Sequence, residues 1–250
     1  MAPPLSLSGH SPSGRSPSER SPSGFPFRNN PARKIILASA SPRRSEILRA
    51  AGINYKVIGT SIRERQRKGE PASKFVARMA AEKAAAVLAR LPEASPYPIL
   101  GADTVVVVGR RTLGKPASVE EARRMLRLLS GKKHTVLTGL CLLWPSSQGA
   151  LPGTLQRVLQ GSGPRPSRKA ARNKSVRVVA TTVKFCRLTE QEIEQYVATR
   201  EPLGKAGAYA IQGGASKFAE WVHGCYFNVV GLPVSVVYLM LKKIDTAGQD

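Results

Sequence analysis

Ile35-Ile36-Leu37-Ala38-Ser39-Ala40-Ser41-Pro42-Arg43-Arg44-Ser45-Glu46-Ile47-Leu48 is an apolar, strand-like run that turns directly into the start of a helix. Ser41 is a favoured N-cap, Pro42 suits the first helical turn, and Gly52 ends the helix. Backbone N–H groups, the helix dipole and both arginines would converge at this turn. Two interpretations fit these residues: a phosphate site, or an ordinary strand-to-helix turn with solvated arginines.

The composition indicates a globular protein without a membrane span. The chain has 250 residues, 42% of them apolar, which suffices for a core of ordinary size. It has no apolar run of about 18 residues and no secretory h-region at its N-terminus. The odd number of cysteines, Cys141, Cys186 and Cys225, favours reduced thiols. We therefore expect a cytoplasmic protein; the Ser- and Arg-rich N-terminus also weakly resembles an organelle transit peptide.

The net charge of +23 favours polyanionic ligands, either nucleotides or nucleic acid. Aromatic residues are only 6% and do not alternate with a basic stripe, which disfavours nucleic acid. Residues 1–32 are rich in Ser, Pro and Arg and are expected to be a disordered tail. The folded domain is expected at 33–245, with a disordered insertion at 145–175. A linker between two domains is the alternative for that insertion.

The run at 99–108 predicts a strand that is buried on both faces, and Asp103 interrupts it. A buried aspartate needs a cation, a metal or hydrogen-bond donors. It is therefore either catalytic or metal-linked, or a structural residue bonded to local backbone. A hairpin-like turn at 109–112 would bring Lys115 back towards Asp103.

Other patterns place the remaining candidates. Helical spacing at 73–91 puts Lys83 in a long amphipathic helix, preceded by a polar loop at 59–70 that could act as a flap. Capping boxes at 118–121 and 189–192 predict two more helices, and strands are expected at 134–144 and 176–187. Small residues at 201–214 would let the backbone approach a ligand near Lys205 and Gln212. Residues 229–241 are expected to be a strand, a turn at Pro233 and a helix.

These residues alone predict an α/β protein that handles phosphate. Neither a P-loop nor a dinucleotide-binding motif is present. One aspartate among several cations, Asp103 with Arg43, Arg44, Lys83 and Lys115, suits hydrolysis of a phosphoanhydride. In such a reaction the cations and a metal neutralise the developing charge while the carboxylate activates water.

An ordered set of short motifs resembles the Maf family of nucleoside triphosphate pyrophosphatases. The motifs are Leu37-Ala38-Ser39-Ala40-Ser41-Pro42-Arg43-Arg44, Ala81-Glu82-Lys83-Ala84, Gly101-Ala102-Asp103-Thr104, Gly114-Lys115-Pro116, Leu129-Ser130-Gly131, Ala206-Gly207-Ala208-Tyr209, Ile211-Gln212-Gly213 and Val230-Gly231-Leu232-Pro233. The resemblance implies an α/β fold with a mixed twisted sheet flanked by helices and a ligand cleft between two lobes. It covers about 34–244.

The resemblance also implies hydrolysis of a nucleoside triphosphate to its monophosphate and pyrophosphate with Mg²⁺ or Mn²⁺. Asp103 would accept the proton, Arg43, Thr104 and Gln212 would govern substrate choice, and Ser41, Arg44, Lys83 and Lys115 would surround the triphosphate. The residues at 206–213 look like the branch acting on dTTP and UTP, in housecleaning of nucleotide pools. A Gln amide can pair with the imide edge of a pyrimidine. A homodimer is expected by the same resemblance.

One departure concerns the metal. Many family members have an acidic cluster where this chain has Thr60-Ser61-Ile62-Arg63-Glu64, so Glu64 and Asp103 are the remaining candidate ligands. Two alternatives therefore stay open. One is a pyrophosphatase for 7-methyl-GTP or another modified nucleotide, and the other is a basic regulator that binds nucleotides or nucleic acid with weak catalysis.

Overall fold

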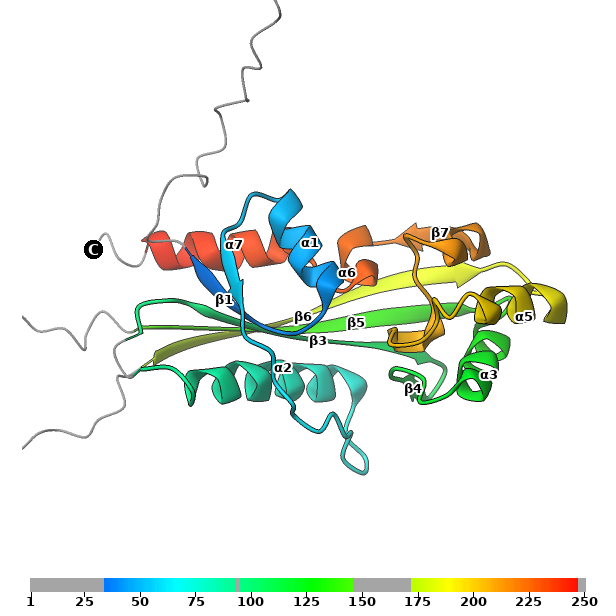
Figure 1. Cartoon of the computed structure of the whole chain (residues 1–250), viewed down its shortest axis with the longest axis horizontal. Helices are drawn as coiled ribbons and strands as arrows, with labels where there is room; N and C mark the ends of the chain where they lie inside the picture. Colours follow the sequence, from blue (N-terminus) through cyan, green and yellow to red (C-terminus); the bar gives the residue numbers. More distant parts are fainter. Residues whose placement is uncertain (1–33, 93–94, 146–171, 247–250) are drawn as a thin grey trace, which may run out of the picture.

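Seven strands form one mixed sheet in the order β2-β1-β3-β5-β6-β7, with β4 paired to β3 (Figure 1). The computed structural model describes residues 34–92, 95–145 and 172–246. The strand β1 runs parallel to β2 and β3, whereas β3, β5, β6 and β7 pair antiparallel. The predicted α/β class with a mixed sheet is therefore confirmed.

The strands and helices have the following bounds. The strands are β1 (Ile35–Ala38), β2 (Tyr55–Val57), β3 (Ile99–Val108), β4 (Arg111–Leu113), β5 (Lys133–Pro145), β6 (Arg172–Phe185) and β7 (Ala219–His223). The helices are α1 (Pro42–Ala50), α2 (Ala72–Leu88), α3 (Val119–Leu129), α5 (Glu190–Ala198), α6 (Tyr226–Val230) and α7 (Val234–Thr246), with 3₁₀ turns η3 (Ala206–Ala208) and η4 (Gly214–Phe218). The predicted capping box at Thr189 is present, and Ser118 caps α3.

Helices cover both faces of the sheet. The long helix α2 lies along one face, and α1, α6 and α7 lie on the other, while α3 and α5 pack together at one end (Figure 1). Along β3, Leu100, Ala102 and Val106 belong to the larger core, and Ile99 and Val105 face the smaller clusters beneath α2. The strand is thus buried on both faces, as its sequence predicts.

A gap in the pairing of β3 creates the cleft. On one edge of β3, residues 99–101 pair with β1 and residues 106–108 pair with β4, so residues 102–105 have no strand beside them. The chain leaves β1 at this gap to begin α1. The edge of β3 therefore opens between a lobe carrying β1 and α1 and a lobe carrying β4, α3 and η3, as the family resemblance implies.

Two glycines let α2 approach the sheet closely. A Cβ atom on Gly101 would lie 2.0 Å from the carbonyl oxygen of Ala80, and one on Gly139 would lie 2.2 Å from that of Val76. Only glycine fits at such distances. This close packing brings Lys83 of α2 next to Asp103 of β3.

Three parts of the chain differ from the prediction. Val229 and Val230, predicted to begin a strand, end the short helix α6, because the side-chain amide of Asn228 bonds across β5 and β6, and Gly231 ends the turn with φ of +128°. Contacts between distant segments here override the strand preference of Val229 and Val230. The strand β7 was not predicted.

The third difference concerns the predicted insertion at 145–175. Pro145 ends β5, and 172–175 already belong to β6, because the antiparallel ladder between these strands extends to Pro145 and Arg172. Residues 146–171 and the predicted tail at 1–32 lie outside the described residues. In the described part of the chain, no helix is long and apolar enough to cross a membrane.

Candidate active site

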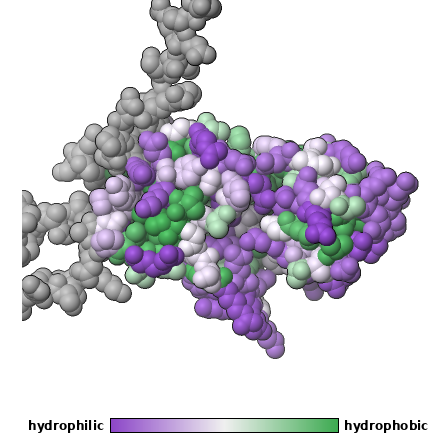
Figure 2. Space-filling view, viewed as in Figure 1, coloured by the Kyte–Doolittle hydropathy of each residue, from purple (hydrophilic) through white to green (hydrophobic). Residues whose placement is uncertain are grey.

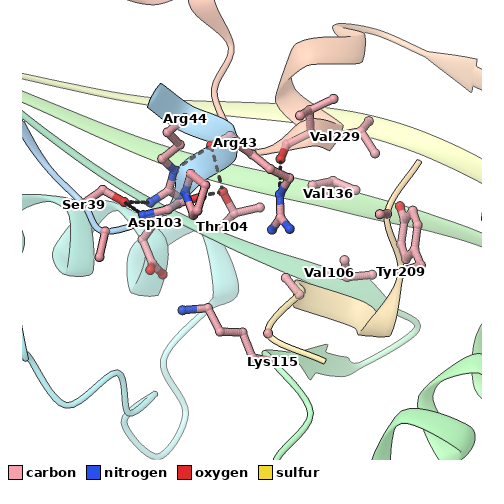
Figure 3. Close-up of a pocket in the computed structure, with 18 of the residues that line it drawn as sticks. Ser39, Arg43, Arg44, Asp103, Thr104, Val106, Lys115, Val136, Tyr209 and Val229 are labelled. Atoms are coloured by element: carbon pink, nitrogen blue, oxygen red, sulfur yellow. Dashed lines mark hydrogen bonds between the residues drawn. The ribbon is translucent and has the colours of Figure 1, made fainter. Parts of the chain in front are cut away.

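The cleft at the gap in β3 is a cavity of about 280 Å³. It is lined by residues from both lobes and from the segment at 204–212 (Figure 3). The structure brings together the site residues that the family resemblance implies: Ser41, Arg43, Arg44, Glu64, Lys83, Asp103, Thr104, Lys115 and Gln212.

A buried ion pair lies at one end of the cleft. The Lys83 ammonium donates to Asp103 Oδ1 at 2.7 Å and to Glu64 Oε1 at 2.5 Å. Asp103 and Lys83 are only 4% and 6% exposed. The cation that a strand aspartate was predicted to need is therefore supplied by the helix packed beneath it.

The two carboxylates that share Lys83 have opposite pKa shifts. Burial raises the pKa of Asp103 above its ordinary value, although the charge of Lys83 opposes this. Burial also acts to raise the pKa of Glu64, but the charge and hydrogen bond of Lys83, with the charge of Lys115, outweigh it and lower the pKa. Asp103 is accordingly the stronger proton acceptor of the two.

Lys115 is an exposed cation of the cleft. Its ammonium lies 3.8 Å from Glu64 Oε2, and its side chain is 59% exposed. It extends towards the cavity from the segment after β4 (Figure 3), as the predicted hairpin requires. A long exposed lysine can follow an anion that enters from solvent.

Arg44 is mainly a structural residue. Its guanidinium donates to Gly231 O at 2.8 Å, to Ser39 Oγ at 2.8 Å, to Ala102 O at 2.9 Å and to Thr104 Oγ1 at 3.0 Å. Four of its five N–H donors are thus directed at protein oxygens. Arg44 thus supplies hydrogen bonds to β3 at the gap where no strand pairs with this strand. The fifth N–H of Arg44 remains available to a ligand.

Arg43 differs from its neighbour. Its Nε donates to Val230 O at 3.3 Å, and its terminal nitrogens have no hydrogen-bond partner among the described residues. The guanidinium points into the cavity (Figure 3). Burial lowers the pKa of Arg43, and the charges of Glu46 and Glu201 oppose that shift.

The start of α1 faces the same cavity. Ser41 occupies the N-cap position as predicted, but its hydroxyl makes no capping bond. Because the first helical turn leaves its N–H groups without helical acceptors, these groups and the Ser41 hydroxyl are available to an anion.

The Thr104 side chain belongs to the same hydrogen-bond network as Arg44. Its hydroxyl accepts from Arg44 at 3.0 Å and lies 2.9 Å from the hydroxyl of Thr138.

The other end of the cleft is apolar. Val106, Val136, Tyr209 and Val229 surround it (Figure 3). Exposed Gln212 lies at its rim and has no hydrogen-bond partner in the part of the chain that the structure describes. Lys205, expected to contact a ligand, donates instead to Glu201 O at 2.5 Å and does not line the cavity.

The flap at 59–70 carries Glu64 into the site and is held by Arg78 of α2 and by Arg90, which follows that helix. Arg78 binds the Glu70 carboxylate through two nitrogens at 2.7 and 2.6 Å, and Arg90 donates to Gly59 O at 2.9 Å. The hydrogen bonds from Arg78 are the main cause that lowers the pKa of Glu70 to about 2. The outer surface of the flap is a hydrophilic projection on the α2 side of the molecule (Figure 2).

Sequence reasoning missed three contributors. Ser39 and the carbonyl of Gly231 hold Arg44, and buried His134 lies 2.9 Å through Nε2 from the hydroxyl of Tyr209. Ser39 and Gly231 lie within the quoted motifs, so membership of those motifs was a usable signal. The pairing of His134 with Tyr209 joins segments 75 residues apart and has no local signal.

A divalent cation fits this donor set in part. No group of three or more His, Cys, Asp or Glu side chains that could hold a metal occurs within the described ranges. Glu64 and Asp103 each use one oxygen in a hydrogen bond to Lys83, and their other oxygens make no hydrogen bond among the described residues, although that of Glu64 lies 3.8 Å from Lys115. Because Mg²⁺ binds through one or two carboxylates together with substrate phosphates, these two residues suit a site that the substrate completes.

Comparisons with known proteins agree with this geometry. The family described as "Maf-like protein" matches residues 34–244. A protein named "dTTP/UTP pyrophosphatase" from Pelotomaculum thermopropionicum is 41% identical over 84% of this chain and 96% of its own length. Proteins of the same name from Anaeromyxobacter dehalogenans and Bacillus thuringiensis are 43% and 40% identical, each over 85% of this chain, and over 94% and 96% of their own lengths.

Proposed function

The chain belongs to the Maf family, and we propose that it hydrolyses dTTP and UTP to the nucleoside monophosphate and pyrophosphate. The observation that carries this proposal is a cleft with two chemically distinct ends. One end holds Asp103 and Lys83, with Arg43 and Lys115 nearby, and the other holds apolar side chains and Gln212. A triphosphate suits the first end and a nucleobase suits the second. The names of the relatives support the choice of dTTP and UTP.

In the proposed reaction, Asp103 accepts a proton from water as the water oxygen bonds to the α-phosphorus. The bond from that phosphorus to the bridging oxygen breaks, and pyrophosphate leaves with the electron pair. Lys83 keeps Asp103 ionised before the reaction, since the ammonium lies 2.7 Å from the carboxylate. Arg43, Lys115 and the start of α1 stabilise the charge that develops on the phosphate oxygens.

Glu64 and Asp103 would hold a divalent cation, Mg²⁺ or Mn²⁺, together with the phosphates. When bound, the cation neutralises negative charge on the triphosphate. The unused oxygens of both carboxylates support this assignment. Arg44 and Thr104 would shape the site at the edge of β3, and Gln212 would contact the edge of the nucleobase.

The decisive experiment measures pyrophosphate release from a panel of nucleoside triphosphates, 7-methyl-GTP included, with Mg²⁺ or Mn²⁺. We expect the highest kcat/KM for dTTP and UTP. Asp103→Asn removes the proton acceptor and should lower kcat at least about 100-fold. Glu120→Gln is the matched control, because it neutralises an exposed carboxylate on α3 that does not line the cleft.

Two outcomes would contradict the proposal. Full activity in Asp103→Asn would exclude this residue as the base. Salt-sensitive binding of nucleic acid, with no hydrolysis of any triphosphate, would instead favour a binding protein.

The assembly and location of the protein are also part of the proposal. We expect a homodimer, which light scattering of the purified protein would test. A cytoplasmic location is supported by the three free cysteines, Cys141, Cys186 and Cys225. Fluorescence microscopy of the tagged full chain would separate the cytoplasm from an organelle.

A further inference from the structure

Gln212 lies on a tight turn whose own backbone contacts are few. The turn spans Ala210 to Gly214 and is closed by one bond, from Gly213 N to Ala210 O at 3.1 Å. Gln212 sits at its exposed tip. A single turn of this kind would leave the side chain poorly placed unless other residues hold both of its ends.

Two side chains outside the cleft lining hold those ends. The N–H of Ala210 donates to the Tyr196 hydroxyl at 3.0 Å, and the N–H of Gly214 donates to Glu201 Oε2 at 3.1 Å. Tyr196 in turn donates to Glu201 Oε1 at 2.8 Å. One connected pair, which we call the Tyr196–Glu201 clamp, thus fixes the entry and the exit of the turn.

The clamp is itself firmly supported. Tyr196 is 4% exposed on α5, with its ring edge-on to Phe218 at 5.4 Å. The Glu201 backbone N–H donates to the Thr199 hydroxyl at 3.1 Å. A Cβ atom on Gly213 would lie 2.5 Å from Glu201 Oε1, so the carboxylate is in direct contact with the turn.

Glu201 also acts on the other proposed determinant of substrate choice. Its negative charge opposes the lowering of the Arg43 pKa by burial. Neither clamp residue lines the cavity. Their hydroxyl and carboxylate oxygens are instead directed at the backbone on either side of Gln212.

We infer that Tyr196 and Glu201 are positioning residues that fix Gln212 against the nucleobase and thereby set the nucleotide preference. This inference rests on the proposed function for its substrate. The triphosphate contacts at Lys83 and Lys115 are made on other elements. Loosening the clamp therefore affects the base end and leaves the phosphate end in place.

The test compares wild type with Tyr196→Phe, Glu201→Ala and Glu201→Gln. We expect the ratio of kcat/KM for UTP to that for ATP to fall by roughly 10- to 100-fold in Tyr196→Phe and Glu201→Ala, chiefly through KM for UTP. Glu201→Gln keeps an acceptor for Gly214 and should recover part of the preference. Tyr97→Phe is the control, since it removes an exposed hydroxyl that does not line the cleft.

Amide hydrogen exchange supplies a second readout that does not need activity. Exchange of the Ala210 and Gly214 N–H groups should accelerate in Tyr196→Phe and Glu201→Ala but not in Tyr97→Phe. An equal loss of kcat/KM for UTP and ATP, or unchanged exchange at 210–214, would overturn the inference. If wild type hydrolyses no triphosphate, the proposed function fails. The positioning role of the clamp is then still tested by the amide exchange rates and by the dissociation constants for UTP and ATP.

Discussion

At the scale of single residues, the adjacent arginines show how one motif divides its work. Both come from the same helical turn, yet Arg44 is directed at four protein oxygens while the terminal nitrogens of Arg43 face the cavity. Successive residues of a helix point about 100° apart, so neighbours in sequence face different surroundings. Arg44 completes the sheet edge, whereas the terminal nitrogens of Arg43 have no hydrogen-bond partner among the described residues.

Buried His134 is the second residue-scale feature. It is 2% exposed, packs edge-on against Phe185 and lies 2.9 Å from the hydroxyl of Tyr209. Burial lowers the pKa of His134 to about 4. The residue is therefore neutral in the folded protein at neutral pH and supports one wall of the cleft through Tyr209.

This shift predicts how stability depends on pH. Between pH 6.5 and 4 the unfolded chain binds a proton at His134 that the folded chain does not bind, so stability falls as the pH falls. We expect this residue to account for a loss of about 2 kcal/mol in unfolding free energy from pH 7 to pH 5. Urea unfolding at the two pH values measures the loss.

The matched variants separate His134 from other titrating groups. His134→Gln should reduce the difference in unfolding free energy between pH 7 and pH 5, whatever its effect on the absolute value. His223→Gln, at an exposed position on β7, should leave the difference as in wild type. An identical pH difference in both variants would exclude His134 as its source.

At the scale of elements, α2 organises the site. It supplies Lys83 to Asp103 and anchors the flap through Arg78, and Arg90, just beyond the end of the helix, adds a further bond to the flap. Its position depends on Gly101 and Gly139, where the helix backbone almost touches the sheet. The flap, the cation and the proposed base are therefore coupled through the seating of one helix.

Gly101→Ala should disturb that seating. The added methyl group would lie 2.0 Å from the carbonyl oxygen of Ala80, which is backbone and cannot rotate away. We expect a loss of about 2–3 kcal/mol in unfolding free energy and weaker pyrophosphate release, as Lys83 moves from Asp103. Chemical denaturation and the activity assay measure the two effects.

Gly114→Ala serves as the comparison for stability, because its Cβ would meet no atom within 4 Å. Its unfolding free energy should stay within about 0.5 kcal/mol of wild type. If Gly101→Ala had the same unfolding free energy as wild type, α2 would be able to shift without losing stability. This result would contradict the prediction made from the close packing.

At the scale of the whole molecule, the cleft is a consequence of topology. One edge of β3 is covered by β1 at its start and by β4 at its end, and the space between them becomes the site. The lobes on either side carry different side chains, since α1 and α2 bring cations and the turn after η3 brings Gln212. In the proposed function, the substrate therefore contacts both lobes at once.

The charge of the whole chain predicts a dependence on salt. A net charge of +23 attracts a triphosphate over long range, and salt screens this attraction. We expect kcat/KM for UTP to fall by roughly tenfold between 50 and 500 mM KCl, with kcat at saturating UTP nearly constant. Steady-state kinetics at several salt concentrations, with circular dichroism to monitor folding, provides the test. An unchanged kcat/KM would show that net charge plays no part in substrate capture.

The sequence by itself determined the local elements and the chemical identity of the site. The α/β class and the residues that gather in the cleft were predicted from four features. These are the alternation of apolar and polar residues in strands, the caps of helices, the buried strand around Asp103 and the ordered motifs from 37 to 233. These features are local, because periodicity, caps and buried polar residues are visible within a few positions of the chain. The strand-to-helix turn at 35–48 was predicted in this way.

Only the tertiary structure decided which partner each residue meets. It placed Lys83 between Asp103 and Glu64, directed Arg44 to β3 and Gly231, and set Tyr196 and Glu201 behind Gln212. It also turned 226–230 into a helix against the strand preference of two valines. Such contacts join segments far apart in sequence, and their energies depend on burial and exact neighbours that no local pattern contains.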